Sequence, residues 1–134
     1  MSIWSITIFF SCKKDKTFVG EWEVSLYKNG NNDSIEDEVL KDMTFIFDNT
    51  QNVTWEFKRL NNIQSSYESR KSVGKWTADF DNHKLFIEWI TSLSDNSFCY
   101  VEIEEINFDF DGCHKVELFI DECLSQPLSI KMEK

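Results

Sequence analysis

The stretch Val53-Thr54-Trp55-Glu56-Phe57-Lys58 alternates apolar and polar side chains, and this alternation decides the fold. Successive side chains of a β-strand point to opposite faces of a sheet, so the apolar residues would be buried and the polar ones solvated. The same period recurs through residues 18–132. We therefore predict an all-β protein.

Working outward from residues 53–58, the pattern predicts about eight strands. In the first, Trp22, Val24 and Leu26 share a face; the others span residues 45–48, 67–80, 85–90, 98–110, 116–121 and 128–132. Turns rich in Asn, Asp and Gly separate them. Short links imply an antiparallel up-and-down meander, which satisfies its edges by closing into a barrel. A two-layer β-sandwich is the alternative.

Two segments depart from the simple alternation. Residues 34–43 fit a helix, in which Ser34 and Asp37 form a capping box, or equally an acidic loop. The strand over residues 98–110 changes phase, because its apolar residues switch from odd to even positions. A β-bulge near Glu104-Glu105 would account for that change.

The composition limits both size and partners. A chain of 134 residues can bury one core, and we expect a single monomeric domain. Its 24 acidic and 14 basic residues give a net charge of −10, which argues against a nucleic-acid partner, because phosphate binding requires a basic surface.

The N-terminal residues predict export. Residues 1–11 are uncharged and mostly apolar, too short to cross a bilayer as a helix but long enough for a signal-peptide core. The stretch Ile8-Phe9-Phe10-Ser11-Cys12 resembles a bacterial lipobox, whose Cys is acylated, with palmitate among its lipids. The resemblance implies a signal peptide over residues 1–11, which could be truncated because no charge precedes Lys13. A lipid-anchored tether follows over residues 12–17, and the folded domain spans 18–134. The alternative is a buried first strand over residues 3–10.

The remaining cysteines are Cys99, Cys113 and Cys123. An exported chain meets an oxidising compartment, and three thiols permit one disulfide and one free thiol. Counting does not fix the pair. Cys99 and Cys123 lie nearly equidistant from the turn at Asp111-Gly112, which favours their pairing and leaves Cys113 to react with alkylating reagents.

The stretch Val19-Gly20-Glu21-Trp22-Glu23-Val24 resembles the Gly-x-Trp first strand of lipocalins and of lipocalin-like lipoproteins of Bacteroidetes. Gly74-Lys75-Trp76 repeats the tripeptide in mid-chain. The order of lipobox, tether, Gly-x-Trp strand and meander is similar across nearly the whole chain. The resemblance implies a lipocalin-like barrel, anchored in the outer membrane of a bacterial cell envelope. The C-terminal Arg that stacks on this Trp in lipocalins has no counterpart in the sequence.

No residue pattern indicates catalysis, so we expect a protein that is not an enzyme and has no cofactor. The stretch from Asn107 to Gly112 resembles half a calcium loop, but a hairpin turn explains it without an ion. The carboxylates of the last third of the chain alternate with apolar residues, as on the solvated face of a sheet; they are Glu102, Glu104, Glu105, Asp121 and Glu122. Only His83 and His114 could join a zinc site, so no metal is expected.

Aromatic side chains supply the functional hypothesis. Seven of them lie on predicted inward faces and are the candidate ligand-lining residues: Trp22, Phe47, Trp55, Phe57, Trp76, Phe80 and Trp89. An eight-stranded barrel is filled by its side chains or holds one small ligand. We therefore expect a lipid-anchored binding protein for a small apolar or amphipathic ligand. The alternative is a solid barrel that acts as a protein-interaction module, an inhibitor or an assembly subunit.

Overall fold

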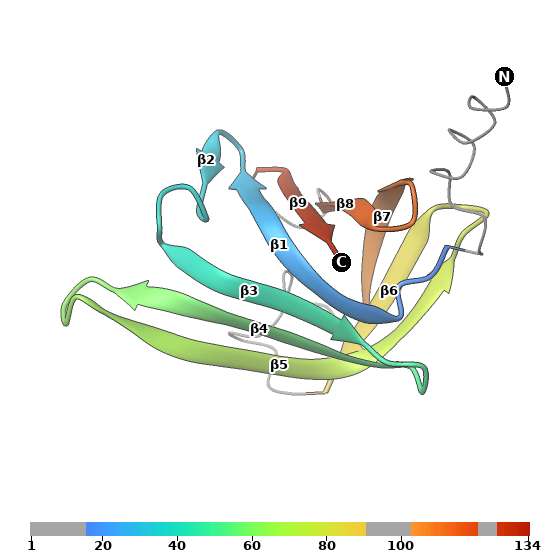
Figure 1. The fold of residues 1–134 in the computed structure, drawn as a ribbon, viewed down its shortest axis with the longest axis horizontal. Helices are drawn as coiled ribbons and strands as arrows, with labels where there is room; N and C mark the ends of the chain where they lie inside the picture. The colour runs from blue at the N-terminus through green and yellow to red at the C-terminus, as the bar shows by residue number, and fades with distance from the viewer. Residues whose placement is uncertain (1–15, 91–102, 121–125) are drawn as a thin grey trace, which may run out of the picture.

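A computed structural model describes residues 16–90, 103–120 and 126–134, in which antiparallel β-strands form a single closed sheet (Figure 1). The strands are β1 (Gly20–Asn29), β2 (Asn32–Asp33), β3 (Leu40–Phe47), β4 (Asn52–Asn61), β5 (Ser66–Asp79), β6 (Lys84–Trp89), β7 (Ile103–Asp111), β8 (Lys115–Ile120) and β9 (Leu128–Glu133). Strand β2 is a two-residue strand that pairs only with the end of β1. The other eight strands follow one another around the sheet in chain order.

Pairing of the first and last strands closes the barrel. Trp22 of β1 lies opposite Phe45 of β3, while Tyr27 of β1 lies opposite Ile130 of β9. Because β1 has a neighbour on both sides, the eight strands leave no long free edge. The predicted eight-stranded antiparallel up-and-down barrel is confirmed, and the β-sandwich alternative is wrong.

A β-bulge in β1 changes which residues face the core. The register with β9 shifts between Val24 and Leu26, where one extra residue is inserted. As a result Tyr27 packs against the core beyond Val24, and Leu26 does not. The prediction that Leu26 shares a face with Trp22 is therefore wrong.

Residues 34–38 form turns, and the predicted helix over residues 34–43 is wrong. The side-chain Oδ1 of Asp33 accepts the backbone N–H groups of Ile35 at 3.0 Å and Glu36 at 3.3 Å. Glu38 then adopts a φ of 60°, which a right-handed helix does not allow. Strand β3 begins two residues later, so the acidic-loop alternative holds only for the first half of this segment.

Strand β7 pairs with β6 and β8 without a register shift along its described length, so the bulge predicted near Glu104-Glu105 is wrong. Ile103 points outward with 55% of its surface exposed, whereas Glu104 is buried with 2% exposed. The apolar pattern changes phase because a carboxylate occupies an inward position. The register of the backbone does not change there. Residues 98–102 of the predicted strand lie outside the described residues.

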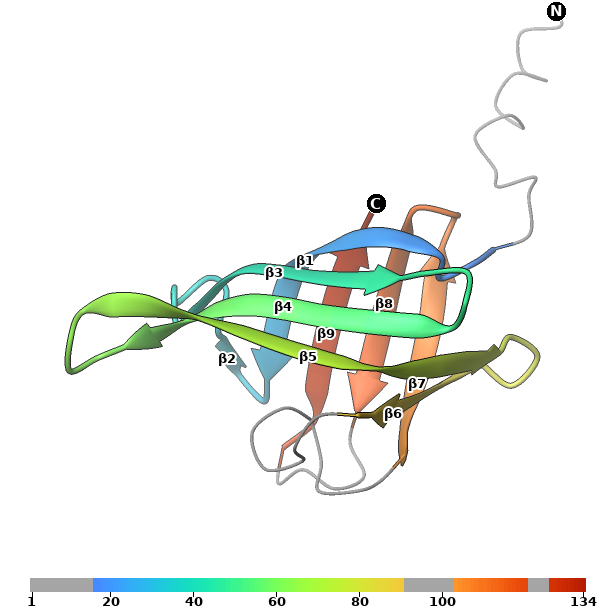
Figure 2. The same cartoon turned by 90° about the horizontal axis from the view of Figure 1, so that it is seen from below.

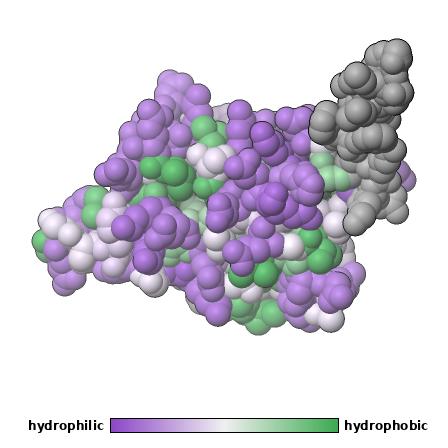
Figure 3. All heavy atoms as spheres, in the orientation of Figure 1, coloured by the Kyte–Doolittle hydropathy of each residue, from purple (hydrophilic) through white to green (hydrophobic). Residues whose placement is uncertain are grey.

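Strands β4 and β5 form a hairpin that extends past the wall of the barrel (Figure 2). The hydroxyl of Tyr67 on this extension donates to the carbonyl oxygen of Glu38 at 2.7 Å, and the Lys41 ammonium lies 4.0 Å from the centre of its ring. These contacts attach the base of the extension to the β1–β3 connection. The face in Figure 3 is mostly hydrophilic, with separate hydrophobic areas.

Candidate functional site

One end of the barrel interior is filled by aromatic rings around Phe18, which is fully buried. The ring centre of Phe18 lies between 4.9 and 6.4 Å from those of its neighbours, which are Trp22, Phe47, Trp76, Phe80, Phe108 and Phe110. We call these seven residues the closed-end cluster. Their mutual packing makes this end of the barrel a core rather than a binding site.

Lys134 covers the closed-end cluster from outside. Its Nζ donates to the carbonyl oxygens of Thr17 at 3.2 Å and Val19 at 2.7 Å, and it lies 4.7 Å from the centre of the Trp22 ring. Burial lowers the pKa of this ammonium group. Lys134 thus covers the Trp22 ring and ties the C-terminus of the chain to the segment that precedes β1.

Gly20 of the Gly-x-Trp strand makes room for this lysine. Its φ is +137°, a conformation that favours glycine, and a Cβ atom there would lie 3.1 Å from Cδ of Lys134. The tripeptide is therefore explained by packing at the closed end.

Replacing Lys134 with Met should lower the free energy of unfolding by about 1–2 kcal/mol, because two charge-assisted hydrogen bonds and a cation–π contact are lost. Urea unfolding measures the change. The matched control is Lys131→Met, since Lys131 lies on β9, which ends just before Lys134, and its side chain is exposed on the outer face. Equal losses in the two variants would contradict the role assigned to Lys134.

The other half of the interior combines aromatic and polar side chains. The Trp55 ring centre lies 4.9 Å from that of Phe57 and 5.8 Å from that of Trp89. Glu104, Tyr27 and Ser72 contribute the polar groups of the same region. We call these six residues the inner cluster.

Glu104 carries the charge of the inner cluster. One of its carboxylate oxygens, Oε1, accepts the indole N–H of Trp89 at 3.0 Å in the buried interior. The expectation that Glu104 belongs to the solvated face of the sheet is therefore wrong. A buried carboxylate carries a large desolvation cost. Its presence inside a barrel therefore indicates that interior hydrogen bonds offset this cost or that the group serves a function.

Tyr27 lies within the electric field of Glu104. Burial raises the pKa of the Tyr27 hydroxyl, and the negative charge of Glu104 raises it further, whereas the positive charge of Arg59 opposes the shift. Arg59 is exposed on β4. The Glu104 carboxylate is therefore close enough to the Tyr27 hydroxyl to disfavour its ionisation, and the exposed Arg59 acts in the opposite direction.

Ser72 presents a buried hydroxyl to the inner cluster. It lies opposite Trp55 in the β4–β5 register and has 1% of its surface exposed. Its Oγ has no hydrogen-bond partner among the described residues. A buried hydroxyl without a partner is energetically unfavourable, which marks this position as one that a bound molecule could satisfy.

The structure divides the seven predicted ligand-lining residues between the two ends. Four of them belong to the closed-end cluster, namely Trp22, Phe47, Trp76 and Phe80, and three belong to the inner cluster, namely Trp55, Phe57 and Trp89. Their contact with a ligand stays a prediction. Sequence reasoning missed Glu104, Ser72 and Tyr27, because the first two are polar and the third is brought inward by the bulge.

Cys113 is disulfide-bonded, so the expectation that it is a free, reactive thiol is wrong. Its partner is one of the other three cysteines, Cys12, Cys99 and Cys123, which all lie outside the described residues. The predicted Cys99–Cys123 pair and the predicted lipid on Cys12 fall outside them as well.

Peptide mapping of the denatured but unreduced protein should find the Cys113 peptide linked to a second cysteine peptide and protected from alkylation. Reduction before alkylation should label Cys113, because the disulfide alone blocks it. Full labelling of Cys113 without a reductant would contradict the structure.

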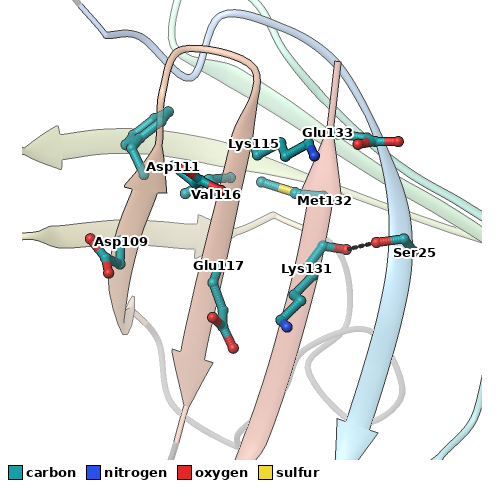
Figure 4. Close-up of a pocket in the computed structure, with 10 residues that line it drawn as sticks. Ser25, Asp109, Asp111, Lys115, Val116, Glu117, Lys131, Met132 and Glu133 are labelled. Atoms are coloured by element: carbon teal, nitrogen blue, oxygen red, sulfur yellow. Dashed lines mark hydrogen bonds between the residues drawn. The ribbon is translucent and has the colours of Figure 1, made fainter. Parts of the chain in front are cut away.

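A hollow lies on the outer surface of the barrel, across β1, β7, β8 and β9 (Figure 4). It has a volume of about 340 Å³. Its charged side chains are four carboxylates, Asp109, Asp111, Glu117 and Glu133, and two lysines, Lys115 and Lys131. Asp109 and Asp111 belong to β7, so the stretch that resembled a calcium loop is strand and hairpin turn. Among the described residues no three His, Cys, Asp or Glu side chains form a metal-binding group.

Comparisons with protein-family profiles, with curated proteins and with solved structures found no match. The described part of the chain contains no helix of the length and apolar character needed to cross a membrane.

Proposed function

We propose that this protein is an exported binding protein that holds a small amphipathic ligand in the inner half of its barrel. The observation that carries the proposal is the asymmetry of the interior. One end is packed with aromatic rings around Phe18, whereas the other combines the aromatic walls of Trp55, Phe57 and Trp89 with buried polar groups. Apolar walls with a few oriented polar groups are typical of small-molecule sites.

Export is supported by the disulfide of Cys113, because disulfides persist in oxidising compartments. We further propose that the chain is attached to the bacterial cell envelope through a lipid on Cys12. Intact-mass analysis of the membrane fraction should show a chain that begins at Cys12 with added acyl mass, and Cys12→Ala should abolish that mass. A soluble chain that retains Met1 would contradict the anchor and leave the binding proposal standing.

The binding proposal is tested by titrating the wild-type domain with small fatty acids, amines, alcohols, sterols and isoprenoids. A ligand of the inner cluster should change tryptophan emission saturably, because Trp55 and Trp89 would both contact it. It should also raise the melting temperature, since a molecule that binds only the native state stabilises that state. Native mass spectrometry of protein purified from its own host would identify a retained ligand. Absence of any response would remove the proposal.

A second candidate function is protein interaction, and the β4–β5 hairpin is the observation that favours it. The hairpin extends beyond the barrel, and Ile63 at its tip is 95% exposed. An apolar side chain at a projecting tip fits a partner pocket. Ile63→Asp should abolish co-purification of such a partner from the host while leaving the fold intact.

A further inference from the structure

The β4–β5 hairpin differs in charge from the rest of the molecule. Residues 58–71 carry four basic side chains and one acidic one, a net charge of +3, whereas the whole chain carries −10. Both arginines of the chain, Arg59 and Arg70, belong to this hairpin. The part of the molecule that projects past the barrel wall (Figure 2) therefore concentrates positive charge on an acidic protein.

Both arginines line one hollow near the end of the hairpin, together with Ile63 and Glu68; we call it the hairpin hollow. Arg59 lies opposite Glu68 in the register of the two strands, and Arg70 follows Glu68 by two residues, so the three side chains share a face. The hollow has a volume of about 340 Å³. It combines two guanidinium groups with an exposed apolar side chain, and arginine is enriched among the residues that carry the binding energy of interfaces.

Glu68 shows that the hairpin hollow accepts a carboxylate. Its Oε2 lies 3.5 Å from Nη2 of Arg70, and its Oε1 accepts an amide N–H of Asn61 at 2.6 Å. The Arg70 and Glu68 side chains are 40% and 44% exposed, so solvent screens the pair and it contributes at most about 1 kcal/mol. Among the described residues Arg59 forms no ion pair. Since each guanidinium has several N–H donors, the hollow has donors and positive charge for a second carboxylate.

We infer that the hairpin hollow binds an acidic peptide segment of a partner protein, whose carboxylates pair with Arg59 and Arg70 while an adjacent apolar side chain packs against Ile63. Arginine binds carboxylates in a bidentate geometry, and arginine clusters are a recurring means of recognising acidic segments. The inference rests on the second candidate function, protein interaction through the hairpin, and specifies the chemistry of the partner. Glu68 then acts as an internal competitor, which the incoming carboxylate displaces from Arg70.

The test measures binding of a short labelled peptide, in which Leu and Glu alternate and both ends are blocked, to the oxidised full-length protein by fluorescence anisotropy. A peptide with Gln in place of Glu should bind at least about tenfold more weakly, because it lacks the charge that strengthens the hydrogen bonds. Arg59→Gln and Arg70→Gln should each weaken binding of the Glu peptide by about tenfold. Glu68→Gln should strengthen it by about threefold, because the internal competitor is removed.

Lys71→Gln is the matched control. Lys71 follows Arg70 on β5, points to the opposite face of the hairpin and pairs with Glu56 at 3.7 Å. Its substitution removes the same charge from the same strand and should change binding of the Glu peptide by less than about twofold. A melting curve for each variant shows that the barrel is folded.

Equal binding of the Glu and Gln peptides, equal losses in Arg70→Gln and Lys71→Gln, or no gain in Glu68→Gln would overturn the inference. Arginine-dependent binding to phosphatidylglycerol vesicles without binding to the Glu peptide would overturn it in favour of a membrane, and arginine-dependent self-association would overturn it in favour of a second copy. The protein-interaction candidate fails separately, if Ile63→Asp retains every partner that co-purifies with the wild-type protein.

Discussion

Replacement of Phe18 with Ala is expected to lower the free energy of unfolding by about 3–5 kcal/mol, the usual loss for a large aromatic residue removed from a core. Phe18 has no exposed surface and contacts rings from β1, β3, β5 and β7, as well as Phe80 just after β5. The rigid β-structure around it cannot collapse into the space that the ring leaves, so the loss should be near the upper end.

Equilibrium urea unfolding measures this effect, and Phe119→Ala is the control. Phe119 is the same residue type on an outer face and is 39% exposed. Its truncation should cost less than about 1 kcal/mol, because partly exposed apolar surface contributes little. Similar losses for the two residues would show that the closed-end cluster does not hold the barrel together.

The second large effect is expected at Gly74 of β5, which lies against the backbone of β6. A Cβ atom there would lie 2.7 Å from the carbonyl oxygen of Glu88 and 3.2 Å from Cα of Trp89. Both neighbours are backbone atoms and cannot rotate away. Gly74→Ala should therefore lower the free energy of unfolding by about 2–3 kcal/mol and alter the near-ultraviolet circular dichroism of Trp89.

Gly112→Ala separates crowding from backbone strain. Gly112 has a φ of +74°, but a Cβ atom there meets nothing within 4 Å. Its substitution should cost about 1 kcal/mol, from conformation alone. If Gly112→Ala were as harmful as Gly74→Ala, the close approach of the two strands would not be the reason for glycine at position 74.

The alternating stretch over residues 53–58 predicted its own strand correctly, because every inward residue in it is apolar. Val53 and Trp55 are buried and Phe57 packs against them, as that pattern requires. The two Gly-x-Trp tripeptides were found as a repeat, yet their glycines serve different purposes. The absence of a side chain at Gly20 leaves room for the Lys134 side chain, and at Gly74 it leaves room for the backbone of β6.

The polar half of the site could not be predicted in the same way. Hydrophobic periodicity assigns a polar residue to the outer face, so Glu104 was placed in solvent and the phase of β7 was explained by a bulge. The bulge that does occur, in β1, leaves no mark in the apolar pattern, although it moves Tyr27 inward. Pairing between strands of the closed barrel determines that Glu104 and Tyr27 point inward. That pairing depends on contacts between residues that are distant in the sequence.

The β7–β8 hairpin also limits the chemistry of Cys12. Cys113 lies in the turn of this hairpin, whereas Cys99 precedes β7 and Cys123 follows β8. The eight steps from Ile103 to Asp111 span about 26 Å, but the four residues from Cys99 to Ile103 reach back at most about 14 Å. Cys123 cannot reach Cys113 either. The three residues from Ile120 to Cys123 extend at most about 10 Å, whereas β8 alone spans about 17 Å. In protein that lacks the lipid proposed for Cys12, we therefore expect the mapping experiment to find Cys12 as the partner.

Thr17, five residues after Cys12, lies near this turn. Lys134 connects the two, since its backbone N–H donates to the carbonyl oxygen of His114 at 2.9 Å while its Nζ donates to that of Thr17. The single sulfur atom of Cys12 can form a thioether to a lipid or a disulfide to Cys113, but not both. The same atom would thus either tether the barrel to a membrane or cross-link the N-terminal segment to the barrel, and the order of acylation and oxidation during export would decide which form the cell contains.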